Sequence, residues 1–192
     1  MEEIILASAS PRRSELLTQI GIRFRVEKSH GDEIITKTAP GEIVEELALQ
    51  KAAEVAQRFD AGIILGADTI VWAEGKVLGK PKDRQDAKEM LLLLQNRAHS
   101  VFTGVTLIRK RPGEKEIIRT FHRETRVHVH SMSEEEIESY LDTGDPFDKA
   151  GSYGIQGPFA AYVDGIEGDY LTVVGLPVSA VYQELRALES SC

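Results

Sequence analysis

Short apolar runs that alternate with longer amphipathic segments are the feature that most limits how this chain can fold. Residues 4–7 and 63–67 are apolar runs with the length and composition of buried strands. Between them, residues 40–59 repeat apolar side chains with the period of a helix, and Pro40 is suited to the first turn. Strands that alternate with helices in this way indicate the α/β class.

Capping residues define the other helices. Gly21 follows one expected helix, at the position where a glycine in the left-handed backbone conformation commonly ends a helix. Asp83 can cap the start of another helix. Ser133 and Glu136 have the spacing of a capping box. The expected helices cover residues 12–20, 40–59, 83–96, 133–141 and 177–188. The expected strands cover residues 4–7, 24–27, 63–67, 99–109, 116–129, 160–163 and 170–174, the last two paired across Asp164-Gly165. Residues 69–73 either extend the strand of residues 63–67 or start a new one.

Length and charge limit the class of protein further. The 192 residues fit one domain, residues 1–192, and the net charge of −8 disfavours a protein that tracks nucleic-acid phosphates. The only cysteine is Cys192, so neither a disulfide framework nor a cysteine zinc site is expected. No apolar run reaches the ~20 residues of a membrane span, and the first residues lack a signal-peptide pattern. We therefore expect a soluble, cytoplasmic protein with neither a membrane nor a nucleic-acid partner.

The segment Ser8-Ala9-Ser10-Pro11-Arg12-Arg13 joins the first expected strand to the first expected helix. Backbone N–H groups at the start of a helix bind anions, and arginine makes forked contacts with phosphate. The segment therefore predicts a phosphate site. The alternative is that Ser10 only caps the helix and that the arginines are solvated.

Carboxylates and lysines provide the next candidates. Asp68 ends an apolar strand in Gly66-Ala67-Asp68-Thr69, where it can act as a general base or a metal ligand, or merely form a turn. Lys51, on the long helix, and Lys80, after a glycine, are candidate cations for phosphate. The pair Asp32-Glu33 can hold Mg²⁺ through carboxylate oxygens, and a solvated acidic loop is the alternative.

A glycine-rich segment, residues 148–157, carries a further candidate. Its glycines permit close approach of the backbone to a ligand, and Gln156 offers both donors and an acceptor to the edge of a base. Whether Tyr153 or Phe159 stacks on such a base is left open. A surface loop without a partner is the alternative. Neither a P-loop nor a dinucleotide-binding GxGxxG motif occurs in the chain.

In this order, the segments resemble the Maf family of nucleoside triphosphate pyrophosphatases. The resemblance runs from Ser8 to Pro177 and also includes Val174-Gly175-Leu176-Pro177. It implies a mixed α/β fold like that of inosine triphosphate pyrophosphatases, with an elongated sheet and two lobes around a cleft. It also implies a nucleoside triphosphate as the small-molecule substrate. Homodimers are common in the family.

The resemblance also implies roles for the candidate residues. Asp68 would be the general base, a metal ligand or both, and Glu33 would help to hold Mg²⁺ or Mn²⁺. Lys51 and Lys80 would be catalytic cations, and phosphate oxygens would also be bound by Ser8, Ser10 and Arg13. Arg12, Thr69 and Gln156 would select the nucleobase of the substrate. These three residues match the branch of the family that hydrolyses dTTP and UTP.

Two alternatives to this function stay open. One is a nucleotide-sensing regulator of septum formation, which would bind a nucleotide without turnover. The other is a purine-directed pyrophosphatase, against which Arg12, Thr69 and Gln156 argue. The sequence leaves open whether a modified pyrimidine nucleotide is preferred to dTTP or UTP.

Overall fold

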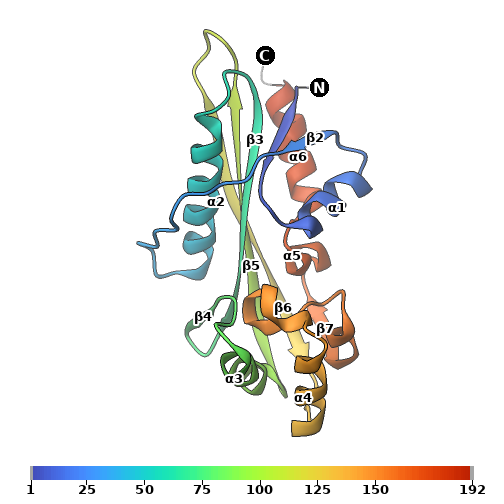
Figure 1. The fold of residues 1–192 in the computed structure, drawn as a ribbon. Helices are drawn as coiled ribbons and strands as arrows, with labels where there is room; N and C mark the ends of the chain where they lie inside the picture. Colours follow the sequence, from blue (N-terminus) through green and yellow to red (C-terminus); the bar gives the residue numbers. More distant parts are fainter. Residues whose placement is uncertain (1, 191–192) are drawn as a thin grey trace. The chain divides into compact units, whose positions relative to one another are not determined.

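A computed structural model, which describes residues 2–190, contains a seven-stranded mixed sheet (Figure 1). The strands follow the order β2-β1-β3-β5-β6-β7, and β4 pairs with β3. Their bounds are β1 Ile4–Ala7, β2 Phe24–Val26, β3 Gly62–Ala73, β4 Lys76–Leu78, β5 Arg97–Lys110, β6 Ile117–Val129 and β7 Val163–Glu167. The α-helices are α1 Pro11–Gln19, α2 Pro40–Ala56, α3 Arg84–Leu94, α4 Glu134–Asp142, α5 Tyr170–Val174 and α6 Val178–Ser190. The predicted mixed α/β class is confirmed, and Cys192 lies outside the described residues.

The chain divides into two compact units, which agrees with the two lobes expected from the sequence. The first unit consists of the residues up to Asp68, residues 103–123 and the residues from Gly175 onward. The second consists of residues 69–102 and 124–174. The first unit holds Ser8, Ser10, Arg12, Arg13, Glu33, Lys51 and Asp68, whereas the second holds Thr69, Lys80 and Gln156.

In the first unit, α2 lies directly against the sheet at two glycines. A Cβ atom on Gly66 of β3 would come within 2.4 Å of the Ala48 carbonyl oxygen, and one on Gly104 of β5 within 2.2 Å of the Val44 carbonyl oxygen. Backbone cannot yield to such a contact, so only glycine lets the helix approach this closely. The core beneath it consists of Ile5, Ala7, Ala52, Val55, Ala56, Ile64 and Ile108.

In the second unit, an aromatic cluster lies in the core together with buried aliphatic residues such as Leu91 and Leu94. Phe159 is fully buried, and its ring lies 4.6 Å from that of Tyr153 and 5.2 Å from that of Tyr140 between centroids. Tyr153 also donates to or accepts from Nε2 of the buried His99, at 2.7 Å. Ion pairs join α3 to α4, with Arg84 bound to Glu138 and Asp142, and Lys88 bound to Glu134 and Glu138.

Several local predictions are confirmed. The side chain of Asp83 accepts a hydrogen bond from the N–H of Asp86 at the start of α3, and Ser133 and Glu136 form the capping box of α4. Gly21 has a φ of 73°, as expected after α1. Residues 69–73 extend the strand of residues 63–67, one of the two possibilities that the sequence left, so Asp68 lies inside β3 and not at a strand end as expected. Within residues 2–190, none of the helices combines the length and apolar character that crossing a membrane requires.

The predicted strand pair of residues 160–163 and 170–174 is wrong. Residues 163–167 instead form β7, which pairs with β6 in antiparallel orientation. Residues 170–174 form α5, although their β-branched and aromatic composition favours a strand. The carboxylate of Asp169 explains the helix, because it accepts hydrogen bonds from the N–H of Leu171 at 3.0 Å and the hydroxyl of Thr172 at 3.1 Å.

Candidate active site

The parallel pairing of β1 with β3 brings two candidate residues to one edge of the sheet. Ala7, the last residue of β1, is opposite Gly66 of β3. Ser8 therefore follows the end of β1, and Asp68 lies just beyond this last pair, inside β3, which continues to Ala73. Both residues are at the carboxyl end of β1, the kind of position where ligands of α/β sheets gather. Ser8 is 7% exposed and Asp68 is 9% exposed, so both polar groups are largely removed from water.

A lysine from α2 joins two carboxylates at this edge. The ammonium of Lys51 donates a hydrogen bond to the carboxylate of Asp68 and lies 2.9 Å from the carboxylate of Glu33. The close approach of α2 to β3 at Gly66 explains this position, since Ala48 and Ala52 of the same helix contact that glycine. Two candidate carboxylates thus share one cation.

Arg13 lies at the same edge and is fixed by hydrogen bonds. Its Nε donates to the carbonyl oxygen of Gly175 at 2.8 Å, and its Nη1 donates to the hydroxyl of Ser8 at 3.0 Å. Burial lowers the pKa of Arg13 from its usual value, and the negative charge of Asp68 opposes that shift. The interpretation of the arginines as solvated is therefore wrong for Arg13. The contact gives the backbone of Gly175 a role that the sequence did not indicate, and its φ of 122° explains why this residue is a glycine.

The start of α1 differs from the simple capping model. Ser10 has the N-cap position, but its side chain makes no capping hydrogen bond, so that alternative is wrong. Its N–H instead donates to the hydroxyl of Ser8 at 3.2 Å. Arg12 is partly exposed, and its positive charge further lowers the pKa of Arg13. Ser8, Ser10 and Arg13 thus form one hydrogen-bonded set, and Glu33, Lys51 and Asp68 form a second set. The negative charges of Asp68 and Glu33 act on Arg13 and relate the two sets electrostatically.

The candidates of the second unit lie on segments that contact each other through the backbone. The N–H of Gly151 donates to the carbonyl oxygen of Gly79 at 3.0 Å, which links the segment of Lys80 to the glycine-rich segment. Lys80 and Gln156 are both exposed, and Thr69 is partly buried. These side chains are therefore not packed into the core of their unit.

A charged clamp that the sequence did not indicate holds the glycine-rich segment. The carboxylate of Asp145 accepts a hydrogen bond from the hydroxyl of Tyr140 at 2.7 Å and lies 3.0 Å from the ammonium of Lys149. A Cβ atom on Gly154 would come within 2.6 Å of Cε of Lys149, and one on Gly157 within 3.1 Å of Oδ2 of Asp145. Both glycines therefore make room for this clamp. Only the spacing of Asp145 and Lys149, an i,i+4 pair, could have signalled it.

Tyr153 and Phe159, the two aromatic side chains considered for stacking, are not available to stack on a nucleobase. Tyr153 is 5% exposed and Phe159 is fully buried. Burial raises the pKa of Tyr153 far above its usual value, so its hydroxyl stays protonated next to His99. Both rings belong to the aromatic core of the second unit.

The donor atoms of the first unit fit a divalent cation that is shared with a substrate. Glu33 and Asp68 provide carboxylate oxygens around one positive charge, that of Lys51. No cluster of three or more potential metal-ligating side chains occurs in the described part of the chain. Mg²⁺ characteristically binds to one or two carboxylates, with phosphate oxygens and water as its other ligands. The two carboxylates match that mode and do not match a metal held by protein alone.

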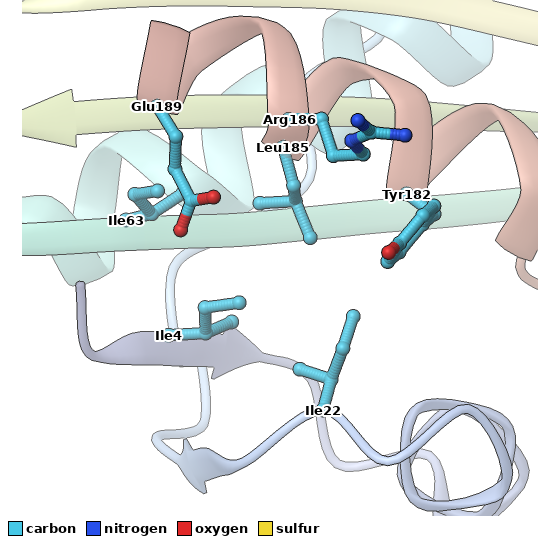
Figure 2. Close-up of a pocket in the computed structure, with 7 residues that line it drawn as sticks. All are labelled: Ile4, Ile22, Ile63, Tyr182, Leu185, Arg186 and Glu189. Atoms are coloured by element: carbon cyan, nitrogen blue, oxygen red, sulfur yellow. The ribbon is translucent and has the colours of Figure 1, made fainter. Parts of the chain in front are cut away.

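A separate pocket of about 110 Å³ lies at the other end of β1 (Figure 2). Its lining includes Ile4, the first residue of β1, and Leu185 of α6. None of the candidate residues lines it; its lining combines four aliphatic side chains with Tyr182, Arg186 and Glu189. The pocket is therefore distinct from the charged group at the carboxyl end of β1.

Comparison with known proteins gives a consistent result. The model of the family described as "Maf-like protein" matches residues 3–188. A dTTP/UTP pyrophosphatase of Agathobacter rectalis is 49% identical over 205 residues, which cover 98% of each chain. A dTTP/UTP pyrophosphatase of Symbiobacterium thermophilum is 50% identical and covers 96% of this chain and 93% of its own. Among solved structures, the Ham1 protein of Staphylococcus aureus aligns with a TM-score of 0.42 at 14% identity, over 79% of this chain and 85% of that chain.

Proposed function

This chain belongs to the Maf family, and from that premise we propose that it is a pyrophosphatase that hydrolyses dTTP and UTP. The products are the nucleoside monophosphate and pyrophosphate. Relatives of nearly the same length carry the name of this activity. The observation that carries the proposal is the ammonium of Lys51 between the carboxylates of Asp68 and Glu33. Water attack on a phosphate ester needs a base and nearby cations, and this group supplies both.

Asp68 is the general base in this proposal. Its carboxylate accepts a proton from water while the water oxygen bonds to the α-phosphorus. The bond from that phosphorus to the oxygen that bridges to the β-phosphate breaks, and this oxygen leaves within pyrophosphate. Lys51 donates a hydrogen bond to the carboxylate and offsets its negative charge beside an anionic substrate. General-base catalysis of this kind contributes about 10²–10⁴-fold to the rate.

Fixed cations bind the phosphate oxygens. Arg13 is preorganised, since the Gly175 carbonyl and the Ser8 hydroxyl fix the plane of its guanidinium. Lys51 and Lys80 add positive charge, and Ser10 adds a hydroxyl at the start of α1. Preorganised charges of this kind stabilise the negative charge that spreads over the phosphate oxygens during the reaction.

Mg²⁺ or Mn²⁺ is the cofactor in this proposal, held by Glu33 and Asp68. When bound, such a cation neutralises phosphate charge and polarises the oxygens at the reacting phosphorus. The support is the pair of carboxylates around the single charge of Lys51. Whether Asp68 is base, ligand or both is decided by comparing the metal affinity and the rate of its variants.

Arg12, Thr69 and Gln156 select the pyrimidine nucleobase of the substrate in this proposal. Uracil and thymine present two carbonyl acceptors on either side of one N–H donor. A glutamine amide supplies donors and an acceptor in one plane, which complements part of that edge. Gln156 is exposed, so its amide is accessible to a substrate. Modified pyrimidine nucleotides with the same edge belong to the same substrate class.

Three further expectations belong to the same proposal. The 192 residues act as one domain, the reaction takes place in the cytoplasm, and the assembly is a homodimer. Light scattering of the purified protein tests the last of these, with a mass near 42 kDa expected from twice 21.2 kDa.

The test is an incubation of the protein with Mg²⁺ or Mn²⁺ and a panel of nucleoside triphosphates, followed by separation of the products. We expect pyrophosphate and monophosphate from dTTP and UTP, with activity lost in Asp68→Asn. Turnover confined to purine nucleotides would retain the reaction but contradict the role of Gln156. Tight binding of a nucleotide without turnover would instead support the nucleotide-sensing regulator.

A further inference from the structure

The segment that carries Glu33 is held against α2 by three side chains one helical turn apart. Residues 29–36 form no helix or strand. Backbone groups of this segment form hydrogen bonds with the side chains of Glu46, Gln50 and Glu54 of α2. A spacing of four residues places such side chains on one face of a helix. The three therefore form a continuous row of polar contacts along the segment.

The first and last members of the row fix its two ends. The carboxylate of Glu54 accepts hydrogen bonds from the hydroxyl of Ser29 and from the N–H groups of His30, at 2.8 Å, and Gly31, at 2.9 Å. These bonds, that of Ser29 above all, lower the pKa of Glu54 to about 2. At the other end, the carboxylate of Glu46 accepts from the N–H of a threonine, residue 36, at 2.8 Å.

Gln50 is the central member and binds the residue next to Glu33. Its Oε1 accepts a hydrogen bond from the N–H of Ile34 at 3.0 Å, and its Nε2 donates to the carbonyl oxygen of the same residue at 2.6 Å. An amide side chain supplies a donor and an acceptor together, so it pairs with both backbone groups of one residue. A carboxylate or an apolar side chain cannot make both bonds.

Apolar packing does not explain the position of this segment. Ile34 is 63% exposed and Ile35 is 52% exposed, so the segment buries little apolar surface. The side chain of Glu33 is itself 55% exposed and lies 2.9 Å from Lys51. The hydrogen bonds of Gln50 are thus the nearest restraint on the backbone from which the Glu33 carboxylate projects.

We infer that Gln50 is a positioning residue, which sets the carboxylate of Glu33 for the metal and phosphates through the backbone of Ile34. This inference rests on the proposed function for the identity of the ligand. It does not assign Gln50 any contact with substrate. Residues that orient a metal ligand typically affect metal affinity or activity by about 10- to 100-fold.

The first test compares Gln50→Ala with Gln57→Ala. Gln57 is an exposed glutamine at the end of the same helix, so it is a matched control for the substitution. We expect Gln50→Ala to raise the Mn²⁺ concentration for half-maximal activity, and the Kd for Mn²⁺ measured by electron paramagnetic resonance, by about 10-fold or more. The KM for UTP at saturating Mn²⁺ and the parameters of Gln57→Ala stay within about twofold of wild type. Unchanged Mn²⁺ parameters in Gln50→Ala would overturn the inference.

A double-mutant cycle distinguishes positioning from general loss of structure. If Gln50 acts through Glu33, then adding Gln50→Ala to a protein that already carries Glu33→Gln should change the Kd for Mn²⁺ by less than about twofold. An effect of the same size in both backgrounds would contradict the inference. Amide hydrogen exchange at Ile34 provides a second measurement, since loss of Gln50 removes the acceptor of that N–H and should speed its exchange.

These results separate this inference from the proposed function. Wild-type protein that binds Mn²⁺ but releases no pyrophosphate from any nucleotide would contradict the proposed function. The double-mutant cycle on the Kd for Mn²⁺ would still decide the role of Gln50. If wild-type protein hydrolyses UTP and the Mn²⁺ parameters of Gln50→Ala equal those of wild type, only the inference is contradicted. Wild-type protein that binds no Mn²⁺, with or without UTP, would overturn it as well.

Discussion

The two units of this protein position their candidate residues by different means. In the first unit, Arg13 contacts Ser8 directly after the end of β1, and Lys51 of α2 contacts Asp68 within β3. In the second unit, Gln156 and Lys80 are exposed, and the segments that carry them are held by other residues, such as Asp145 and Lys149. The first arrangement resembles a preformed charged centre, and the second resembles a supported recognition loop. The difference predicts that changes at the charged contacts of the first unit mainly affect the rate. Changes at Gln156 and at the residues that support its segment mainly affect substrate selection and binding, and changes in the core of the second unit affect stability.

The largest effect is expected from Lys51→Met, which keeps the length of the side chain but removes its charge. Two carboxylates then face each other without the cation between them, and a preorganised positive charge is lost near the phosphates. We expect kcat/KM for UTP to fall by about 10²–10³-fold. Lys115→Met, at an exposed lysine of the same unit, is the control. Equal activity of the two variants would remove the distinction between the units.

The next effect concerns stability of the second unit at low pH. Burial lowers the pKa of His99 from 6.5 to about 4, with a smaller contribution from the positive charge of His128. Its Nδ1 is buried and meets no hydrogen-bond partner among the described residues. The folded state therefore binds its proton less readily than the unfolded state, so stability is full above pH 6.5 and declines as the pH falls toward about 4.

Urea denaturation between pH 7.5 and pH 4 measures this decline. The 2.5-unit difference between 6.5 and about 4 corresponds to a loss on the order of 3 kcal/mol. His99→Gln carries no charge at any pH and should show a flatter profile over the same range. A profile of the same slope in both proteins would show that other groups govern acid stability.

A smaller effect is expected from Gln156→Ala, and it concerns selectivity. Loss of the amide removes hydrogen bonds to the pyrimidine edge, so the ratio of kcat/KM for UTP over CTP should fall by about 10- to 100-fold. Gln85→Ala, at an exposed glutamine of α3 in the same unit, should leave the ratio unchanged. A fall in kcat with an unchanged ratio would move Gln156 from recognition to catalysis.

The smallest effect is expected from the clamp of the glycine-rich segment. Lys149 contacts both Asp145 and Asp148, whose side chains are 23% and 64% exposed. Asp145→Asn weakens the more buried pair and its bond with Tyr140, so we expect about a 10-fold rise in KM for UTP. Asp148→Asn changes an exposed pair and should alter KM by less than about twofold. The reverse order of the two variants would show that burial does not decide which carboxylate matters.

Much of the first unit could be predicted from the sequence. An apolar run followed by polar residues correctly indicated that Ser8 follows a strand. The same pattern predicted that Asp68 ends its strand, and this was wrong, because Asp68 lies inside β3 just beyond its parallel pairing with β1. The contact of Lys51 with Asp68 required the packing of α2 on β3, which depends on glycines 66 and 104. Gln50 was missed because a polar residue on the exposed side of a helix looks like any solvated residue until the facing segment is placed.

The second unit was harder to predict. Tyr170–Val174 has the composition of a strand, and a single cap by Asp169 changes it to a helix. The glycines of residues 148–157 suggested a ligand, yet Gly154 and Gly157 are close to Lys149 and Asp145 of the same unit. Tertiary contacts rather than local propensity determine these features, so one sequence alone does not contain a signal for them.

The most direct test of the central claim is hydrolysis of UTP in water labelled with ¹⁸O, followed by mass spectrometry of both products. Attack of water on the α-phosphorus, with Asp68 as base, predicts the label in UMP and not in pyrophosphate, with the rate lowered by about 10²–10⁴-fold in Asp68→Asn. Label in pyrophosphate would place the attack at the β-phosphorus. An undiminished rate in Asp68→Asn would show that another group takes the proton.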